Sequence, residues 1–200
     1  SRGLGDVYKR QFQYSEDQRN KIRNELKLGN SFTAIHTGRF IEQKNQMFIL
    51  DIFANLLVKC PDAKLLLLGT GDLLDKTKKH AIKLGILENV CFLGVKSNVE
   101  EYLCAADCYV MPSLYEGLPV AAVEAECTGL PCVLSENITR EVNLRNQVSF
   151  ISLEAPISEW CNKILEYKDM TRMDGSRDVI THGYYIQYGA KKLQKFYEDK

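Results

Sequence analysis

The chain has 200 residues, of which 45% are hydrophobic and 26% charged, and this composition excludes an intrinsically disordered protein. Its 26 basic and 26 acidic residues give a formal net charge of zero, which excludes a broad electrostatic surface for nucleic acid or for an anionic membrane. Any anion that the protein binds must therefore be held by a local group of cations or amides.

Apolar periodicity and turn residues predict an alternation of helices and strands. Residues 1–11 have no apolar period, and we expect them to be a tag or the boundary of a fragment. Capping-box patterns occur at Ser15 with Gln18 and at Ser97 with Glu100. The predicted helices cover residues 16–28, 46–59, 73–84, 97–106, 156–167 and 182–198, and one more begins at Pro119. The predicted strands cover residues 31–37, 64–69, 89–94, 108–111, 131–135 and 148–152, and residues 168–181 form a polar connection.

Short apolar strands joined by helical crossovers specify a doubly wound α/β domain with a mostly parallel sheet and helices on both faces. We expect residues 12–200 to form one such domain. In these sheets, ligands bind beyond the carboxyl ends of the strands. The candidate site is therefore assembled from four loops, at residues 37–45, 69–73, 94–97 and 112–119.

The first loop carries two cations, Arg39 and Lys44. A guanidinium fork and an ammonium group that converge on the crevice suit a diphosphate. The alternative is that both are solvated surface cations. The sequence of this loop taken alone favours the second interpretation.

The second and third loops offer main-chain groups. The Gly-Thr-Gly run that ends at Gly71 has the first two glycines of a dinucleotide fingerprint, but Leu74 stands where the third would be. The run indicates a close approach of the backbone, either to a ligand or within a tight turn. The backbone of Gly94 and Val95, just before Lys96, could hydrogen-bond the edge of a nucleobase. The sequence alone does not decide whether it does.

The fourth loop leads into a helix start that can hold an anion. Gly117, Leu118 and Val120 offer N–H groups there, and Pro119 at the first helical position sacrifices no hydrogen bond.

Two carboxylates flank this helix start. Glu116 precedes the glycine turn and is expected to point into the crevice, towards the far end of the same ligand. Glu124 lies on an otherwise apolar helix, where a ribose diol would satisfy both of its oxygens. For either glutamate alone, a charge or capping contact at a helix N-terminus is an equal alternative. Their spacing in this frame favours a ligand site.

Five motifs occur in a fixed order along the chain. They are GRFIEQKNQ (38–46), LLLLGTGD (65–72), VCFLG (90–94), ADCYVMPSLYEGLPVAAVEAECTGLPCVLSE (106–136) and TREV (139–142). In this order they resemble the family 4 retaining glycosyltransferases of the GT-B fold, in particular bacterial capsular and exopolysaccharide enzymes. The resemblance runs from about Phe12 to the C-terminus. Its most specific element is the pair Glu116 and Glu124, followed by GLPCV.

The resemblance implies transfer of a glycosyl group from a nucleotide-sugar, with UDP the expected nucleotide, to an acceptor hydroxyl with retention of configuration. It implies that Arg39 and Lys44 hold the donor diphosphate and that Glu116 contacts the donor sugar near the reacting centre. No metal or other cofactor is expected, because cations and the helix end take up the charge of the leaving diphosphate. The chain has no Asp-x-Asp motif, in agreement with this.

The remaining roles follow from the same resemblance. Glu124 matches the residue that holds the nucleotide ribose, and Gly117 and Leu118 match the segment whose amides contact phosphate and sugar. Residues 94–96 match the contacts to the base.

Two departures limit what the resemblance implies. Pro119 stands where many members have glycine, which removes an amide donor. The resemblance therefore does not indicate which sugar is transferred. GT-B enzymes have two Rossmann-like domains, and the N-terminal acceptor-binding one has no counterpart here. The resemblance therefore implies a donor half that has little activity alone and reaches its glycan or lipid-linked acceptor through an absent domain.

The cysteines and the hydropathy bear on location. Seven cysteines lie mostly in apolar runs, which is typical of reduced, buried thiols in a cytoplasmic protein, and no metal-ligand spacing is present. No apolar run approaches the ~20 residues of a membrane span. We expect a cytoplasmic protein, with any association at the inner face of the membrane through absent parts only.

Two other functions remain alternatives. One is a binding module that is active only with a separate acceptor-domain chain. The other is an NAD-dependent oxidoreductase domain, disfavoured because the glycine fingerprint is incomplete and does not follow the first strand. Of the histidines, His36 ends the first strand, where it either lines the crevice or lies buried with its hydrogen bonds satisfied.

Overall fold

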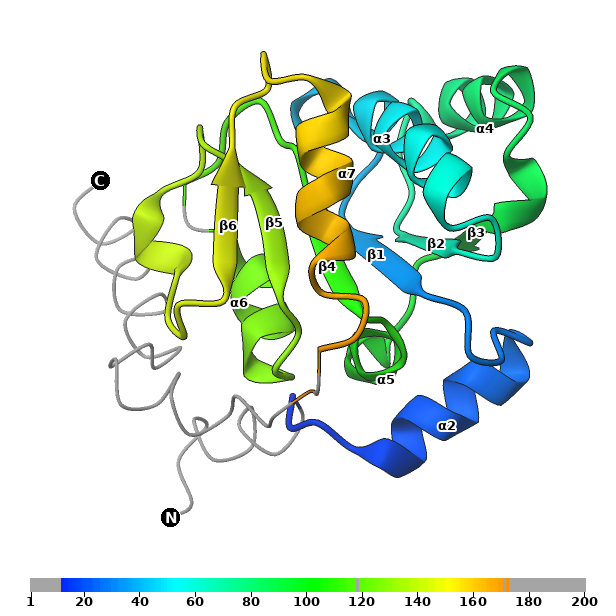
Figure 1. Cartoon of the computed structure of the whole chain (residues 1–200), viewed down its shortest axis with the longest axis vertical. Coiled ribbons are helices and arrows are strands. Elements are labelled where there is room, and N and C mark those ends of the chain that lie inside the picture. The colour runs from blue at the N-terminus through cyan, green and yellow to red at the C-terminus, as the bar shows by residue number, and fades with distance from the viewer. Residues whose placement is uncertain (1–11, 118, 171, 173–200) are drawn as a thin grey trace, which may run out of the picture.

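The computed structural model describes residues 12–117, 119–170 and 172, and its centre is a six-stranded sheet (Figure 1). The strands lie in the order β3-β2-β1-β4-β5-β6, and every neighbouring pair is parallel. This order confirms the doubly wound fold expected from the sequence. The strands are β1 (Thr33–Thr37), β2 (Lys64–Leu68), β3 (Val90–Gly94), β4 (Cys108–Met111), β5 (Cys132–Ser135) and β6 (Val148–Ile151).

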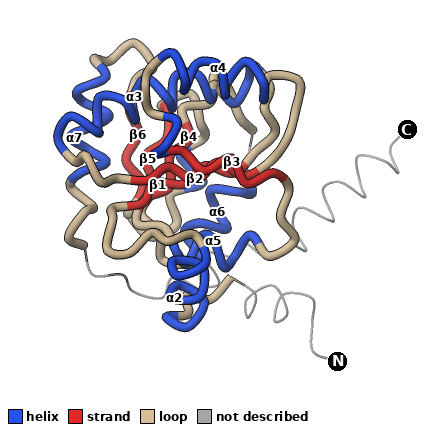
Figure 2. Tube along the Cα trace, turned by 90° about the vertical axis from the view of Figure 1, so that its right-hand side faces the viewer, coloured by secondary structure: helices blue, strands red, loops and turns tan. Residues whose placement is uncertain are grey.

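Helices cover both faces of the sheet (Figure 2). One layer consists of α3 (Gln46–Lys59), α4 (Leu74–Lys83) and α7 (Ile157–Leu165), and the other of α2 (Glu16–Glu25), α5 (Val99–Ala105) and α6 (Val120–Cys127). Successive strand residues point to opposite layers, so Ala34 packs into the α3 layer and Ile35 into the α6 layer. Because both faces are covered, β1, β4 and β5 are buried along their whole length.

The first helix is shorter than the predicted range 16–28. It ends at Glu25, because Lys27 takes a left-handed φ of 54° that breaks the helical path. Its predicted cap is confirmed, since the Ser15 hydroxyl accepts a hydrogen bond of 3.3 Å from the main-chain N–H of Gln18.

Two other helix starts differ from the sequence-based prediction. The capping box at Ser97 is wrong: α5 begins at Val99, and its N-cap, Asn98, makes no capping bond, while its amide donates to the Glu101 carboxylate. Pro119 is the N-cap of α6, with a ψ of 99°, rather than the first helical residue.

The other predicted strands and helices are confirmed to within two residues at each end where the structure describes them. The predicted helix at 182–198, residues 1–11, Leu118 and most of the connection 168–181 lie outside the described residues. All seven cysteines have free thiols, and six of them are buried. Within the described ranges, no helix has the length and hydropathy to cross a membrane.

The direction of winding reverses between β1 and β4, the two central strands. After β1 the chain continues to β2 and β3 on one side, and after β4 it continues to β5 and β6 on the other. In sheets that wind in this way, ligands bind in the crevice beyond the carboxyl ends of the two strands at which the winding reverses. This topology brings residues 38–45 and 112–117 together.

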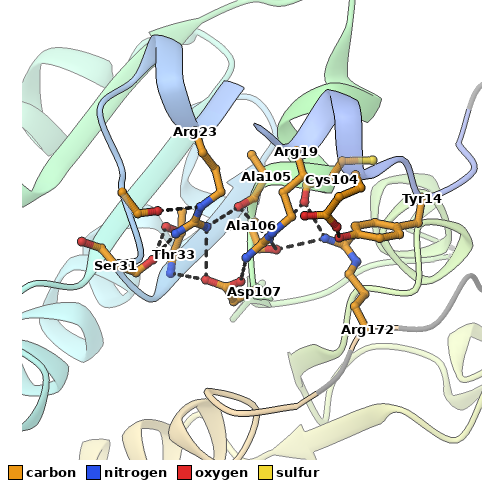
Figure 3. Close-up of polar contacts among 12 residues, drawn as sticks. Tyr14, Arg19, Arg23, Ser31, Thr33, Cys104, Ala105, Ala106, Asp107 and Arg172 are labelled. Carbon is orange, nitrogen blue, oxygen red and sulfur yellow. Dashed lines mark hydrogen bonds and ion pairs between the residues drawn. The ribbon is translucent and has the colours of Figure 1, made fainter. Parts of the chain in front are cut away.

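Three arginines close the opposite edge of the sheet, where the strands begin (Figure 3). Arg19, Arg23 and Arg172 donate to main-chain carbonyls at the C-terminal end of α5, a position where cations offset the helix dipole. Asp107 accepts from Arg19 at 2.7 Å and lies 3.5 Å from Arg23. The five hydrogen bonds of Arg172 compensate the burial of its charge, and its guanidinium stacks over Tyr14. This cluster holds together the edge of the sheet at which the strands begin, opposite their carboxyl ends.

Candidate functional site

A cation and a carboxylate meet in the crevice between β1 and β4. Lys44 ends the short 3₁₀ helix Glu42–Lys44 in the loop after β1, and Glu116 lies in the loop after β4. Lys44 Nζ lies 2.5 Å from Glu116 Oε1, and the two side chains are only 17% and 10% exposed. Two residues selected from the sequence for one ligand are therefore in direct contact.

Hydrogen bonds other than this ion pair also join the two loops. The main-chain carbonyl of Gln43 accepts from Leu114 N at 2.8 Å, and the Gln43 amide donates to the carbonyl of Tyr115 at 3.0 Å. The Asn45 amide donates to the carbonyl of Pro112 at 3.2 Å. These bonds involve the main chain of residues 112–115. They therefore set the position of the loop after β4 independently of the ion pair.

Glu116 has further support from the next strand connection. Its backbone forms an isolated parallel bridge with Ile138, and Asn137 donates to the carbonyl of Leu114 at 2.9 Å. The Ser135 hydroxyl donates to the carbonyl of Ser113 at 2.6 Å. The loop after β4 is thus held on both sides, and Glu116 has a defined position.

Arg39 lies on the same loop as Lys44, with an exposed side chain. No ion pair to its guanidinium is found in the described part of the chain, whereas its main-chain carbonyl accepts from the Gln46 amide at 2.7 Å. The loop is therefore fixed through its backbone, and the exposed guanidinium is available to a ligand.

The Gly-Thr-Gly run at residues 69–71 packs against the loop that carries Arg39 and Lys44, which is called the cation loop below (residues 38–45). A Cβ atom at Gly69 would lie 2.0 Å from the carbonyl oxygen of Gly38, and one at Gly71 would lie 2.5 Å from that of Phe40. Both glycines also have positive φ, of 127° and 156°. The close backbone approach inferred from the sequence is thus, at least in part, a contact between two loops. Contact of Gly71 with a ligand stays a prediction.

The helix that follows Glu116 begins beside the crevice. Glu124 lies in the second turn of α6 and is half-buried. Burial raises the pKa of Tyr109, and the Glu124 carboxylate contributes to this rise, so its charge acts on the central strand β4. The Tyr109 hydroxyl in turn contacts Thr37 at the carboxyl end of β1. Glu124 therefore lies near enough to Tyr109 for its charge to act on that hydroxyl, and its contact with a ligand stays a prediction.

The remaining predicted contacts form the rim of the site. Val120 is 59% exposed in the first turn of α6, and the position of a Cβ atom at Gly117 is open space. Gly94 ends β3, two strands away from β1, and Val95 follows it; the Gly94 carbonyl accepts from Gly69 N at 2.8 Å, and Val95 is 75% exposed. Val95, Gly117 and Val120 are thus exposed, and contacts of their main-chain groups with a ligand stay predictions.

The amides beside Lys44 are a functional feature that the sequence interpretation missed. Gln43, Asn45 and Gln46 each hold a main-chain carbonyl of one of the two loops. Amide side chains gathered at the start of a helix indicate such contacts, because they can donate to the main-chain carbonyls of neighbouring loops.

The described residues contain no group of three or more His, Cys, Asp or Glu side chains that could hold a metal ion. The charged chemistry of the crevice therefore consists of two cations, two carboxylates and main-chain amides. This combination can bind an anionic ligand that also carries hydroxyl groups.

Comparisons with known proteins agree with this chemistry. The family described as "Glycosyl transferases group 1" matches residues 17–153, more than half of the chain. The chain is 41% identical over 130 residues to a putative glycosyltransferase, EpsF, of Bacillus subtilis, covering 64% of this chain and 34% of that protein. It is 28% identical over 180 residues to the UDP-Gal:alpha-D-GlcNAc-diphosphoundecaprenol alpha-1,3-galactosyltransferase of Escherichia coli, covering 85% and 46%. The chain thus spans less than half the length of these two relatives.

A solved structure shows the same fold. The crystal structure of Anabaena HepE in complex with UDP and glucose superposes with a TM-score of 0.78 at 19% sequence identity, covering 96% of this chain and 55% of that one. The fold of the chain agrees with the family match, and that match over more than half of the chain shows that the chain belongs to the glycosyl transferases group 1 family.

Proposed function

We propose that this domain binds the donor of a retaining glycosyltransferase, a nucleotide diphosphate sugar, in the crevice between β1 and β4. The observation that carries the proposal is the contact of Lys44 with Glu116 at the topological switch point; Arg39 lies on the same loop as Lys44. A diphosphate needs cations and a sugar needs hydrogen-bond acceptors, and this contact brings the two together.

Each residue has a role in this proposal. Arg39 and Lys44 bind the diphosphate, with the amides at the start of α6 completing its shell. Glu124 accepts hydrogen bonds from the ribose hydroxyls, and Glu116 accepts from the donor sugar. Main-chain groups at 94–96 contact the base at the far end of the crevice.

The proposed reaction is substitution at the anomeric carbon. The bond from C1 to the β-phosphate oxygen breaks, a bond from the acceptor hydroxyl oxygen to C1 forms on the same face, and the hydroxyl proton passes to the departing diphosphate. Arg39 and Lys44 stabilise the negative charge that develops on that diphosphate, so this proposal needs no metal.

We further propose that the nucleotide is UDP and that the acceptor is a growing capsular, exopolysaccharide or lipid-linked glycan. The UDP bound by the Anabaena neighbour and the printed activity of the Escherichia coli relative support this choice. The acceptor groups lie in a second domain of the complete protein, and the reaction takes place in the cytoplasm. A separate chain that supplies this domain remains the alternative, and co-purification of a second polypeptide would favour it.

A ligand panel tests the proposal. UDP at a hundredfold excess over its Kd stabilises the folded state by about 2.7 kcal/mol, which raises the melting temperature by several degrees. GDP, ADP and NAD serve as comparisons, and Lys44→Ala and Glu124→Ala should each reduce the shift by about half or more, because a tenfold loss of affinity removes about 1.4 kcal/mol of the stabilisation. Glu159→Gln, an exposed change on α7, is the matched control. A wild-type protein whose melting temperature responds to none of the nucleotides would refute the proposal, and a response to NAD alone would favour an oxidoreductase.

A further inference from the structure

A chain of buried polar groups runs under the two cations. His36 Nδ1 lies 2.9 Å from the main-chain oxygen of Val110, and His36 Nε2 lies 3.5 Å from Gln46 Nε2. Gln46 Nε2 also donates to the main-chain oxygen of Arg39 at 2.7 Å. The chain thus links β4, β1, the first turn of α3 and the cation loop.

The partners determine where the protons are. The oxygen of Val110 can only accept, so His36 Nδ1 carries the hydrogen and His36 Nε2 has the lone pair. The Gln46 amide nitrogen then faces two acceptors, which excludes the flipped orientation of the amide. Burial lowers the pKa of His36 to about 4, with a further contribution from the charge of Lys44, so the ring is neutral at pH 7.

The same groups pack against Lys44. A Cβ atom at Gly38 would lie 3.2 Å from His36 Nε2 and 3.4 Å from Lys44 Cε. The imidazole and the Lys44 side chain therefore border the same small space beside Gly38, and a side chain larger than hydrogen at this position would meet both.

One feature of Gln46 argues against a purely stabilising role. Its Oε1 atom is buried and has no hydrogen-bond partner in the described part of the chain. A buried acceptor without a partner costs free energy, which offsets what the Nε2 bonds contribute. An apolar side chain of similar length removes the cost together with the bonds.

We propose that Gln46 and His36 are positioning residues for donor binding. They hold the cation loop at a fixed place over β4, so that Arg39 and Lys44 meet the diphosphate without rearrangement, and neither of them contacts the ligand. This inference rests on the proposed function, because it concerns the diphosphate site of the donor.

Two substitutions separate positioning from stability. Gln46→Met should melt at the wild-type temperature and bind UDP about tenfold more weakly in calorimetry. His36→Asn retains a donor for Val110 but does not reach Gln46, so we expect a similar loss, and the double variant should bind no more weakly than either single one. Asn55→Ala removes an exposed amide from the same helix and serves as the control, with wild-type affinity.

A double-mutant cycle shows whether Gln46 acts through the cation loop. In a Lys44→Ala background, Gln46→Met should cost less than threefold in UDP affinity. A full tenfold loss there, or wild-type affinity of Gln46→Met alone, would overturn the inference while leaving the proposed function in place. Failure of the wild-type protein to bind UDP would instead refute the proposed function, and the positioning role with it.

Discussion

Lys44 Nζ and Glu116 Oε1 are 2.5 Å apart, although 72 residues separate them in the sequence. Each side chain compensates the partial burial of the other's charge. In the proposed site, Lys44 faces the diphosphate and Glu116 the sugar, so the pair marks the junction between the two halves of the donor. Binding of the donor then requires the phosphate oxygens to compete with Glu116 for the ammonium group.

This competition predicts opposite effects for the two residues. Lys44→Met should weaken UDP binding at least tenfold, because a charge-assisted hydrogen bond contributes roughly 1.5–3 kcal/mol. Glu116→Gln should leave UDP affinity unchanged or raise it, because the neutral amide releases Lys44 to the phosphate. Calorimetric titration measures both. Lys21→Met, which removes the surface ion pair with Glu101, is the control. Equal losses in the two variants would contradict the assignment.

A second prediction concerns the ribose. If Glu124 accepts hydrogen bonds from the ribose hydroxyls, wild-type protein should bind UDP about tenfold more tightly than 2′-deoxy-UDP, and Glu124→Gln should reduce this preference. The ratio of the two dissociation constants is the measurement. An unaltered ratio in Glu124→Gln would assign the carboxylate a structural role.

Gly69 and Gly85 both have positive φ, but their surroundings differ, so alanine should destabilise the protein to different extents at the two positions. Gly69→Ala places a methyl group 2.0 Å from the carbonyl oxygen of Gly38, in addition to the strain of a φ of 127°. Gly85→Ala carries only the strain of a φ of 70°, in open space, at a cost of about 1–2 kcal/mol. Gly69→Ala should therefore lower the free energy of unfolding by more than Gly85→Ala, and it should also weaken UDP binding. Equal destabilisation in urea unfolding would show that the loops can separate freely.

His36 predicts a dependence of stability on pH. Its pKa is 6.5 when unfolded and about 4 when folded, chiefly because burial disfavours the imidazolium ion. Between these values the unfolded state binds more protons, so the contribution of His36 to stability is complete above pH 6.5 and falls as the pH decreases to 4.

A comparison with His36→Asn isolates this contribution. The difference in unfolding free energy between the wild type and the variant should change by up to about 3 kcal/mol between pH 7 and pH 4, to the disadvantage of the wild type. Glu126, whose pKa burial raises to about 7, is present in both proteins and cancels in the difference. Urea unfolding at several pH values makes the measurement, and a constant difference would show that the ring is not held neutral.

The fold could be predicted well because its determinants are local. Apolar strands of four or five residues, glycines after helices and residues such as Ser15 act within a few positions, and the alternation of elements then selects a doubly wound sheet. The misplaced starts of α5 and α6 show the limit of such rules. Asn98 turns its amide to Glu101, a choice that no periodicity reveals.

The candidate site could be predicted only in its charged residues. Arg39, Lys44, Glu116 and Glu124 attract notice as charges beside strand ends. Their contacts depend on which strands are neighbours, and the sequence does not state that β4 pairs with β1. The amides that fix the loops were missed for the same reason, because their partners are main-chain carbonyls that carry no sequence signal.

The most direct test of the donor site is a crystal structure of the domain with UDP. We expect the diphosphate between Arg39 and Lys44 beside the start of α6, the ribose hydroxyls within hydrogen-bond distance of Glu124, and the base at residues 94–96. Density for UDP at the opposite edge of the sheet, near Asp107 and Arg172, or on any surface away from Lys44, would contradict it.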